Sequence, residues 1–189
     1  MTTLVALAFT IAVSAAAPAA DRIPRPAVPI DIEVLGDYRV FLVGHAVGTQ
    51  NYICSATPSG LDWVFIGPQA TVFDNSGVQI LTHFHSFNPS KDAIHATWQH
   101  SRDTSLVWAT RHSGSTDPIY VAPDAIEWLL LDVSGAQVGP SGGDKVSAAA
   151  FIQRVNTVGG LKPAAAECTT GKITNRKLVP YEADYYFYR

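Results

Sequence analysis

The chain has 189 residues, a length that suits one domain with a sizeable hydrophobic core. Hydrophobic residues make up 47% and charged residues 15%, and the 12 prolines and 14 glycines are spread along the chain, which favours a turn-rich β protein over a helical bundle. The net charge is -3 and the lysines and arginines are scattered singly, so composition argues against nucleic acid as a partner.

Residues 1–20 resemble a secretory signal peptide, because an apolar run from Leu4 to Val13 is followed by small residues. Cleavage is expected after Ala15 or near Ala20. A buried first helix or a short anchor is the alternative interpretation. The run is too short to cross a bilayer as a helix, which takes about 20 residues, and no other segment is long and apolar enough. The sequence therefore predicts secretion, or residence in the secretory pathway, and no membrane span.

Residues 21–37 are expected to form an N-terminal arm, since three prolines between Asp21 and Ile30 rule out a helix interior or a central strand. Glycines at positions 44 and 48, and the Gly67-Pro68 pair, are expected to end strands. Short β-type runs then follow one another, separated by glycine, proline, asparagine and aspartate turns, at residues 38–43, 50–55, 61–66, 70–73, 78–85, 94–100, 106–110, 126–133, 148–156 and 180–189.

Two of these runs leave an alternative open. Residues 126–133 are almost continuously apolar and predict a strand buried on both faces, with a helix as the competing interpretation. Residues 148–156 fit helix or strand by propensity and are assigned as a strand. The whole pattern predicts one all-β domain over residues 38–189, a β-sandwich or flattened barrel of short antiparallel strands.

The stretch from residue 78 to residue 100 holds four of the six histidines. Because side chains alternate along a strand, Leu81, His83 and His85 should share one face. The turn-forming residues 88–92 predict a hairpin that brings Trp98 and one or both of His95 and His100 close to this face.

Cys54 and Cys168 are the only cysteines. An even count in a chain expected to enter an oxidising compartment favours a disulfide over two reduced structural cysteines. No glycine fingerprint for a dinucleotide, no Walker loop and no Gly-x-Ser-x-Gly nucleophile turn is present, and we expect no cofactor. A copper or zinc site remains an alternative, with His83 and His85 as two ligands and His95, His100 or His112 as a third.

The chain resembles a secreted domain-of-unknown-function family that is common in ascomycete fungi and also occurs in bacteria. The resemblance covers most of the chain after Tyr38 and is carried by Gly48-Thr49-Gln50-Asn51-Tyr52-Ile53-Cys54, Trp63-Val64-Phe65, His83-Phe84, Thr97-Trp98-Gln99, Trp128-Leu129-Leu130-Leu131, residues 152–160 (IQRVNTVGG), Pro163 with Cys168, and residues 179–185 (VPYEADY). It implies a signal peptide, a β-sandwich and a Cys54–Cys168 bridge.

The chain departs from the family pattern between His83-Phe84 and Thr97-Trp98, where residues 85–96 form an insertion, and residues 102–105 replace a usual Asp-Gly-Ser turn. Proteins similar to this family include the hetero-Diels–Alderases of fungal tropolone sesquiterpenoid pathways. These enzymes generate a quinone methide by dehydration and guide its cycloaddition to a terpene alkene. The resemblance thus implies an enzyme of fungal secondary metabolism that takes apolar small-molecule substrates.

Such a reaction needs an aromatic, apolar cavity that orients two reactants, together with groups that polarise oxygen and assist the loss of water. His83 or His85 is expected to act as the general acid, with Arg102 or Arg111 holding an acidic oxygen. The catalytic candidates are His83, His85 and Arg102, and the substrate-binding candidates are Tyr52, Trp63, Phe84, Trp98, Arg111 and Tyr185. The alternative functions are a non-catalytic secreted cell-wall or interaction protein, and a metal-binding protein.

Overall fold

The structure is a computed structural model, and it describes residues 22–189. The signal peptide expected at residues 1–20 lies outside the described residues. In the described part, no helix has the length and apolar character needed to cross a membrane. Its strands are β1 (Val40–Thr57), β2 (Gly60–Phe73), β3 (Gln79–Asn88), β4 (Ala93–His100), β5 (Leu106–Ser115), β6 (Trp128–Gln137), β7 (Phe151–Gly159) and β8 (Arg176–Tyr188), and its short 3-10 helices are η1 (Ile30–Ile32), η2 (Ala165–Glu167) and η3 (Thr170–Lys172).

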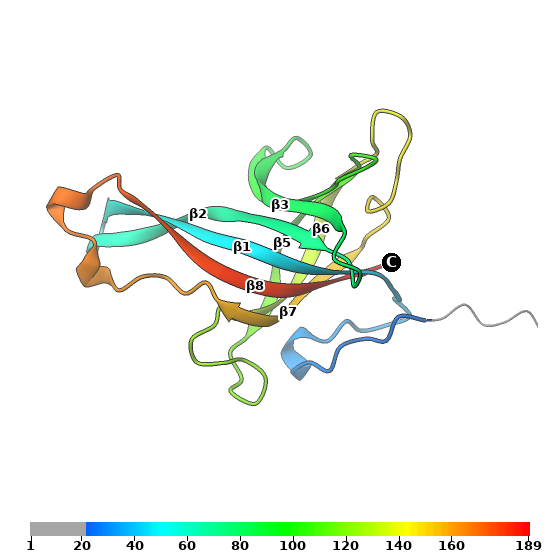
Figure 1. The fold of residues 1–189 in the computed structure, drawn as a ribbon, viewed down its shortest axis with the longest axis horizontal. Helices are drawn as coiled ribbons and strands as arrows, with labels where there is room; N and C mark the ends of the chain where they lie inside the picture. Colours follow the sequence, from blue (N-terminus) through cyan, green and yellow to red (C-terminus); the bar gives the residue numbers. More distant parts are fainter. Residues whose placement is uncertain (1–21) are drawn as a thin grey trace, which may run out of the picture.

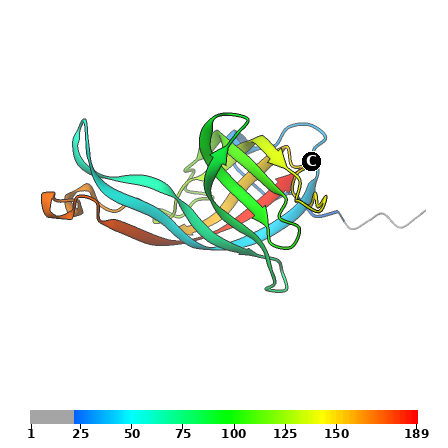
Figure 2. The same ribbon diagram turned by 90° about the horizontal axis from the view of Figure 1, so that it is seen from above.

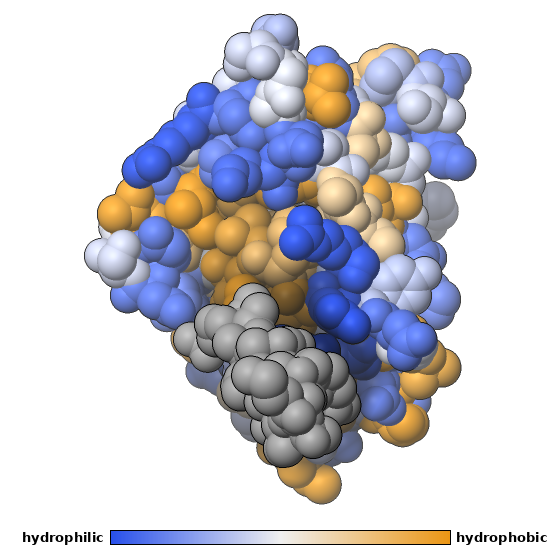
Figure 3. All heavy atoms as spheres, turned by 90° about the vertical axis from the view of Figure 1, so that its right-hand side faces the viewer, coloured by the Kyte–Doolittle hydropathy of each residue, from blue (hydrophilic) through white to orange (hydrophobic). Residues whose placement is uncertain are grey.

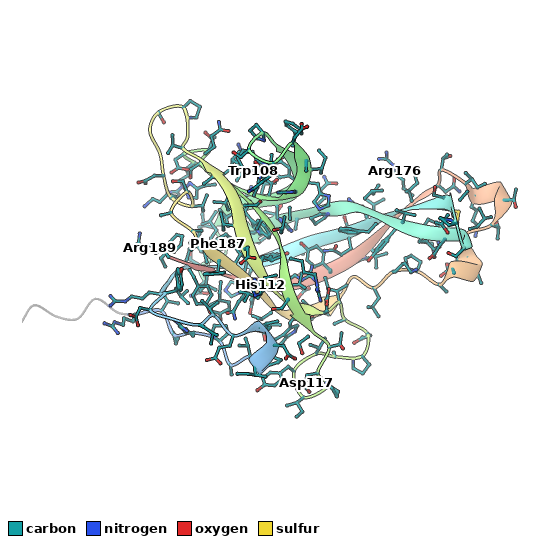
Figure 4. All side chains as sticks on the ribbon, turned by 180° about the vertical axis from the view of Figure 1, so that it is seen from behind. Trp108, His112, Asp117, Arg176, Phe187 and Arg189 are labelled. Atoms are coloured by element: carbon teal, nitrogen blue, oxygen red, sulfur yellow. A yellow bond between two sulfur atoms is a disulfide. The ribbon has the colours of Figure 1, made fainter. Side chains whose placement is uncertain are left out.

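The eight strands form a closed barrel in which each strand pairs antiparallel with the next along the chain, and β8 returns to pair with β1 (Figures 1 and 2). The all-β class is confirmed, and the architecture is the barrel rather than the sandwich. Several strands are longer than the short runs that the sequence predicts. The ends of β1, β2 and β8 extend well beyond the barrel on one side, and Arg176 on this extension and the C-terminal Arg189 lie at opposite ends of the molecule (Figure 4).

The barrel is filled by side chains that alternate along its strands. Leu129 of β6 and Tyr185 and Phe187 of β8 belong to this inner core. Trp98 of β4 is 1% exposed and packs edge-on against Tyr185 and Phe187, with ring centroids 5.2 and 6.3 Å apart. These aromatic contacts join β4 and β8 across the interior.

A second hydrophobic layer lies outside the barrel wall, where the N-terminal arm packs against β5, β6 and β7. Trp128 and Leu130 of β6 pack there with Ile32 and Val34 of the arm, and both arm residues are almost completely buried. The side-chain amide of Gln153 donates a hydrogen bond of 2.6 Å to the carbonyl oxygen of Ile32. The first four residues of β6, 128–131, are therefore buried on both faces, as the continuous apolar run predicts, and the competing helix is ruled out.

The extension carries a small core of its own around the disulfide. Cys54 of β1 is bonded to Cys168, and their Cα atoms are 5.3 Å apart. Tyr52 and Trp63 complete this cluster. The predicted disulfide is confirmed, and it is consistent with a protein of an oxidising compartment.

The predicted strand breaks at Gly44 to Gly48 and at Gly67-Pro68 are wrong, since β1 and β2 run through them. Gly48 faces Ala70 on the neighbouring strand, and a Cβ atom at Gly48 would lie 2.2 Å from the carbonyl oxygen of Gln69. The glycine thus permits two strands to approach closely. It does not end either of them.

Candidate functional site

A pocket of about 280 Å³ occupies the barrel lumen, and every one of the eight strands contributes to its lining. Of the sixteen lining residues, nine are apolar or carry a phenyl, phenol or indole ring, and seven are polar. The lining residues are Gln50 of β1, Phe65 and Pro68 of β2, His83 and His85 of β3, Ile94, His95, Ala96 and Trp98 of β4, Ala109, Thr110 and Arg111 of β5, Leu129 and Leu131 of β6, Arg154 of β7 and Tyr185 of β8.

The hairpin of β3 and β4 supplies the aromatic part of this lining. His83 lies directly opposite Trp98 in the register, and their rings stack with centroids 4.0 Å apart and planes 13° from parallel. Tyr185 packs edge-on against the ring of His83 at 5.1 Å. Side chains alternate along β3, so Leu81 and His83 lie inside the barrel, as expected, and Thr82 and Phe84 lie on the opposite face.

His83 is an uncharged ring with its two nitrogens in different roles. Its Nδ1 atom lies 2.8 Å from the carbonyl oxygen of Thr97, which can only accept, so Nδ1 carries the hydrogen and Nε2 is an acceptor. Burial lowers the pKa of His83 to about 3, and the nearby charge of Arg154 acts in the same direction. The imidazole is consequently neutral at physiological pH.

Three hydrogen-bond donors of the pocket lining are buried and have no partner among the described residues. They are Nε2 of Gln50, Nε1 of Trp98 and Nε of Arg154. Gln50 and Trp98 are 3% and 1% exposed. Buried donors in proteins are almost always satisfied. Five in the described residues have no partner, and three of the five belong to residues that line this one pocket, which makes it a candidate position for an acceptor.

His85 lies in the barrel wall between the lumen pocket and the outer surface. Its half-buried ring lines the lumen pocket on one side and a groove on the outer surface of β2 and β3 on the other. Phe65 packs edge-on against it at 5.6 Å. Gly67 makes room for the ring, since a Cβ atom there would lie 2.9 Å from it. Burial lowers the pKa of His85 below its ordinary value.

The remaining histidines of the hairpin are bonded within the fold. His95 lines the pocket and its Nδ1 atom lies 2.7 Å from the hydroxyl of Ser134. His100 pairs with Asp103 at 2.8 Å. Within residues 22–189, no group of three or more histidine, cysteine, aspartate or glutamate side chains is placed to hold a metal ion. The arrangement gives the copper or zinc alternative no support.

The structure brings together five of the nine predicted site residues and separates the other four. His83, His85, Trp98, Arg111 and Tyr185 line the lumen pocket. The others lie elsewhere: Arg102 is exposed in the turn after β4, Phe84 faces the outer groove, and Tyr52 and Trp63 are packed in the disulfide cluster.

Sequence reasoning missed Gln50 and Arg154, which the structure adds to the pocket. Arg154 stands two positions after the buried Ile152 on β7, and its cross-strand neighbours are Leu129 and Tyr185. Alternation from Ile152 would have pointed to the same face, once the run was known to be a strand. The sequence signal for Gln50 is weaker. This residue lies in the motif that ends at Cys54, and the only role that the motif suggests is the disulfide.

A larger hollow of about 880 Å³ lies outside the lumen, between the arm and the end of the barrel near the C terminus. On this face, hydrophobic side chains lie in the centre with hydrophilic ones around them (Figure 3). Two of its four arginines have structural partners: Arg25 donates to the carbonyl oxygens of Val34 and Gly36, and Arg189 lies over the ring of Phe41. The lumen pocket is therefore the better candidate site.

Fold and pocket together define an up-and-down β-barrel with a pocket in its lumen. The chain belongs to the family described as protein of unknown function DUF3455, whose model matches residues 36–189. Searches of curated proteins and of solved structures give no match. The expected membership in an uncharacterised domain family is thereby confirmed.

Proposed function

We propose that the protein binds an apolar small molecule inside the barrel. The observation that carries this proposal is the combination of a lumen lined mainly by apolar and aromatic side chains with three buried donors, of Gln50, Trp98 and Arg154, that have no partner among residues 22–189. Leaving a donor buried and unpaired costs about 1 to 3 kcal/mol. A ligand oxygen that accepts from these groups recovers that cost, so the ligand is an apolar molecule with at least one oxygen acceptor.

The size of the pocket limits this ligand. A volume of about 280 Å³ is near the lower end of small-molecule pockets, which span roughly 300 to 1,000 Å³. Ile94 and Phe65 line the pocket and are 61% and 43% exposed, so they form an apolar rim against which a longer ligand can extend. The site therefore suits one compact molecule, or two reactants of which one reaches the rim.

For the reaction, we propose a hetero-Diels–Alder cyclisation preceded by loss of water, as the resemblance in the sequence implies. A pericyclic step asks a protein mainly to hold two reactants in a reactive geometry. The stacked rings of His83 and Trp98 form a rigid part of the pocket lining against which a conjugated ring can be held, and the donors of Gln50 and Arg154 can polarise its oxygen.

The expected role of His83 as general acid is not carried forward. Its N–H is bonded to the carbonyl of Thr97, and burial leaves the ring neutral, so it has no proton to donate to a substrate. Its Nε2 atom can instead accept a hydrogen bond from a substrate hydroxyl and orient it. The expected role of Arg102 is not carried forward either, because its side chain lies outside the pocket.

The test uses a hydroxymethyl-substituted tropolone as quinone-methide precursor and a cyclic sesquiterpene alkene. We expect the protein to raise the rate of adduct formation above that in buffer and to give one stereoisomer. H83Q and W98F should each lower this rate by about tenfold or more, since both change the surface that positions the ring. R102Q, outside the pocket, should retain the full rate. A rate equal to that in buffer would remove the catalytic part of the proposal and leave ligand binding to be judged separately.

One observation favours a second candidate, a non-catalytic interaction protein. The extension exposes apolar side chains of two strands: Val64 and Ile66 of β2 are 40% and 39% exposed, and Leu178 of β8 is 59% exposed. Such a surface can contact another macromolecule. Failure of every apolar probe to bind in the lumen, together with an intact fold, would favour this candidate over the first.

A further inference from the structure

Arg154 brings a positive charge to the lumen. On β7 it shares a face with Ile152, which is fully buried in the inner core. Its partners in the neighbouring strands are Leu129 of β6 and Tyr185 of β8, and both of these side chains also line the pocket. The guanidinium group is therefore part of the pocket lining.

The charge of Arg154 has no carboxylate partner among residues 22–189. One guanidinium nitrogen donates to the backbone carbonyl of Glu127 at 2.9 Å, and Nε is buried without a partner. The carboxylate of Glu127 is bound instead by Arg111, through contacts of 3.3 and 3.1 Å. Glu127 thus contributes only a neutral carbonyl to Arg154.

The other groups that sense this charge are also neutral. The charge of Arg154 acts on the pKa values of Tyr52, His83, Tyr181 and Tyr185, and a side-chain hydrogen bond from Arg154 also lowers the pKa of Tyr185. Burial raises the pKa of all three tyrosines above their ordinary value, so none is a phenolate at physiological pH. The side chain of Arg154 is half-buried with its Nε atom fully buried, and residues 22–189 supply no anion to pair with it.

We propose that Arg154 is the anchor for an anionic oxygen, and that the ligand of the lumen is an apolar molecule with one acidic group, a carboxylate or an acidic enol. This inference rests on the proposed binding function and narrows it to acidic ligands. The planar guanidinium suits such an anion, because it can offer two parallel N–H donors. Gln50 and Trp98 add neutral donors to the same pocket.

The test compares two dyes that share one skeleton, the anionic 8-anilinonaphthalene-1-sulfonate and the neutral N-phenyl-1-naphthylamine. Both are titrated into the wild-type protein, R154M and R176M, with fluorescence and calorimetry as readouts. Arg176 is exposed on β8 and does not line the lumen pocket, so R176M has the same change in net charge without a change in the site. We expect R154M to weaken binding of the anionic dye by about tenfold or more and to change binding of the neutral dye by less than about threefold. R176M should alter neither.

The outcomes separate the two proposals. Equal losses of anionic dye binding in R154M and R176M, or equal losses of both dyes in R154M, would overturn the role of Arg154 while leaving the lumen as a binding site. If neither dye binds the wild-type protein, the binding function itself fails. The melting temperature gives a further readout, because R154M also loses the hydrogen bond to the carbonyl of Glu127: a loss of stability without a selective loss of the anionic dye would show a merely structural role. If R154M does not fold, the same two dyes are titrated into R154Q instead.

Discussion

His83 lies between the ring of Trp98 and the carbonyl of Thr97, at the centre of the pocket lining. Its surroundings favour the uncharged ring in the folded protein, whereas the unfolded chain leaves the imidazole free to take up a proton. The folded state therefore has a lower affinity for this proton than the unfolded state. Acidification favours unfolding through this residue.

The pH dependence of stability should show this effect. The pKa of His83 drops from 6.5 to about 3 on folding, so its stabilising contribution is present above about pH 6.5 and is lost as the pH falls towards 3. Between pH 6.5 and 5 the free energy of unfolding should decrease by about 1.5 kcal/mol through this group alone. Urea unfolding of the wild type and H83Q at both pH values measures it as the difference between the two proteins, which cancels the contributions of His45 and His85.

The same pH range also provides the contradicting result. If the wild type and H83Q lose the same free energy of unfolding between pH 6.5 and 5, His83 does not remain neutral in the folded protein. The neutral acceptor role in the pocket would then have to be abandoned.

At this scale the sequence predicts some of the site. His83, Trp98 and His85 could be placed together because alternation along a strand and a turn of known chemistry are local signals. Arg154 and Gln50 reach the pocket only through pairing of β7 and β1 with β8, which joins segments distant in the sequence. The prediction that Arg102 lies in the site is wrong for a related reason. Arg102 follows β4 closely, and where β4 ends decides that this residue falls in an exposed turn.

Among the elements, β1 and β2 illustrate how glycine can mislead a sequence interpretation. Glycine is a frequent signal for a turn, yet Gly48 and Gly67 lie inside long strands. At Gly67 the backbone has a φ of 136° and faces the ring of His85, and a register shift occurs opposite it between Asn51 and Tyr52. The glycine marks a β-bulge, which local sequence does not distinguish from a turn.

Replacing Gly67 should therefore damage both stability and the pocket wall. G67A forces a side chain into a backbone conformation that L-residues rarely adopt and against a ring 2.9 Å away. We expect a loss of about 1 to 3 kcal/mol in the free energy of unfolding and a displaced His85. G171A is the matched control, since a Cβ atom there meets nothing within 4 Å, and it should be close to neutral. Urea unfolding and the NMR signals of the His85 ring would report both changes, and equal stability of the two variants would contradict the account.

At the scale of the whole molecule, the N-terminal arm packs against the outside of the barrel and contributes to its stability. The arm seals the outer faces of β6 and β7, so the wall is packed from inside and from outside. The sequence predicted a strand buried on both faces at residues 126–133, but it left open whether the domain was a sandwich or a barrel. Closure depends on β8 pairing with β1, and a period-2 pattern is the same whether a sheet closes on itself or packs on another sheet.

Two isoleucines of the same 3-10 turn test the role of the arm. Ile32 is completely buried, whereas Ile30 is 77% exposed. I32A should lower the free energy of unfolding by about 2 to 4 kcal/mol, because it leaves a cavity in the outer layer. I30A should change it by less than about 0.5 kcal/mol. Chemical denaturation of both variants gives the comparison, and an I32A protein as stable as I30A would show that the arm is dispensable.

The alternation along β6 has a practical consequence. Leu131 borders the lumen pocket, while Leu130, the very next residue, belongs to the layer beneath the arm. A substitution at Leu131 changes the shape of the lumen pocket, and a substitution at Leu130 changes the packing of the N-terminal arm on the barrel. Ligand specificity and stability can thus be changed separately by substitutions at two adjacent residues.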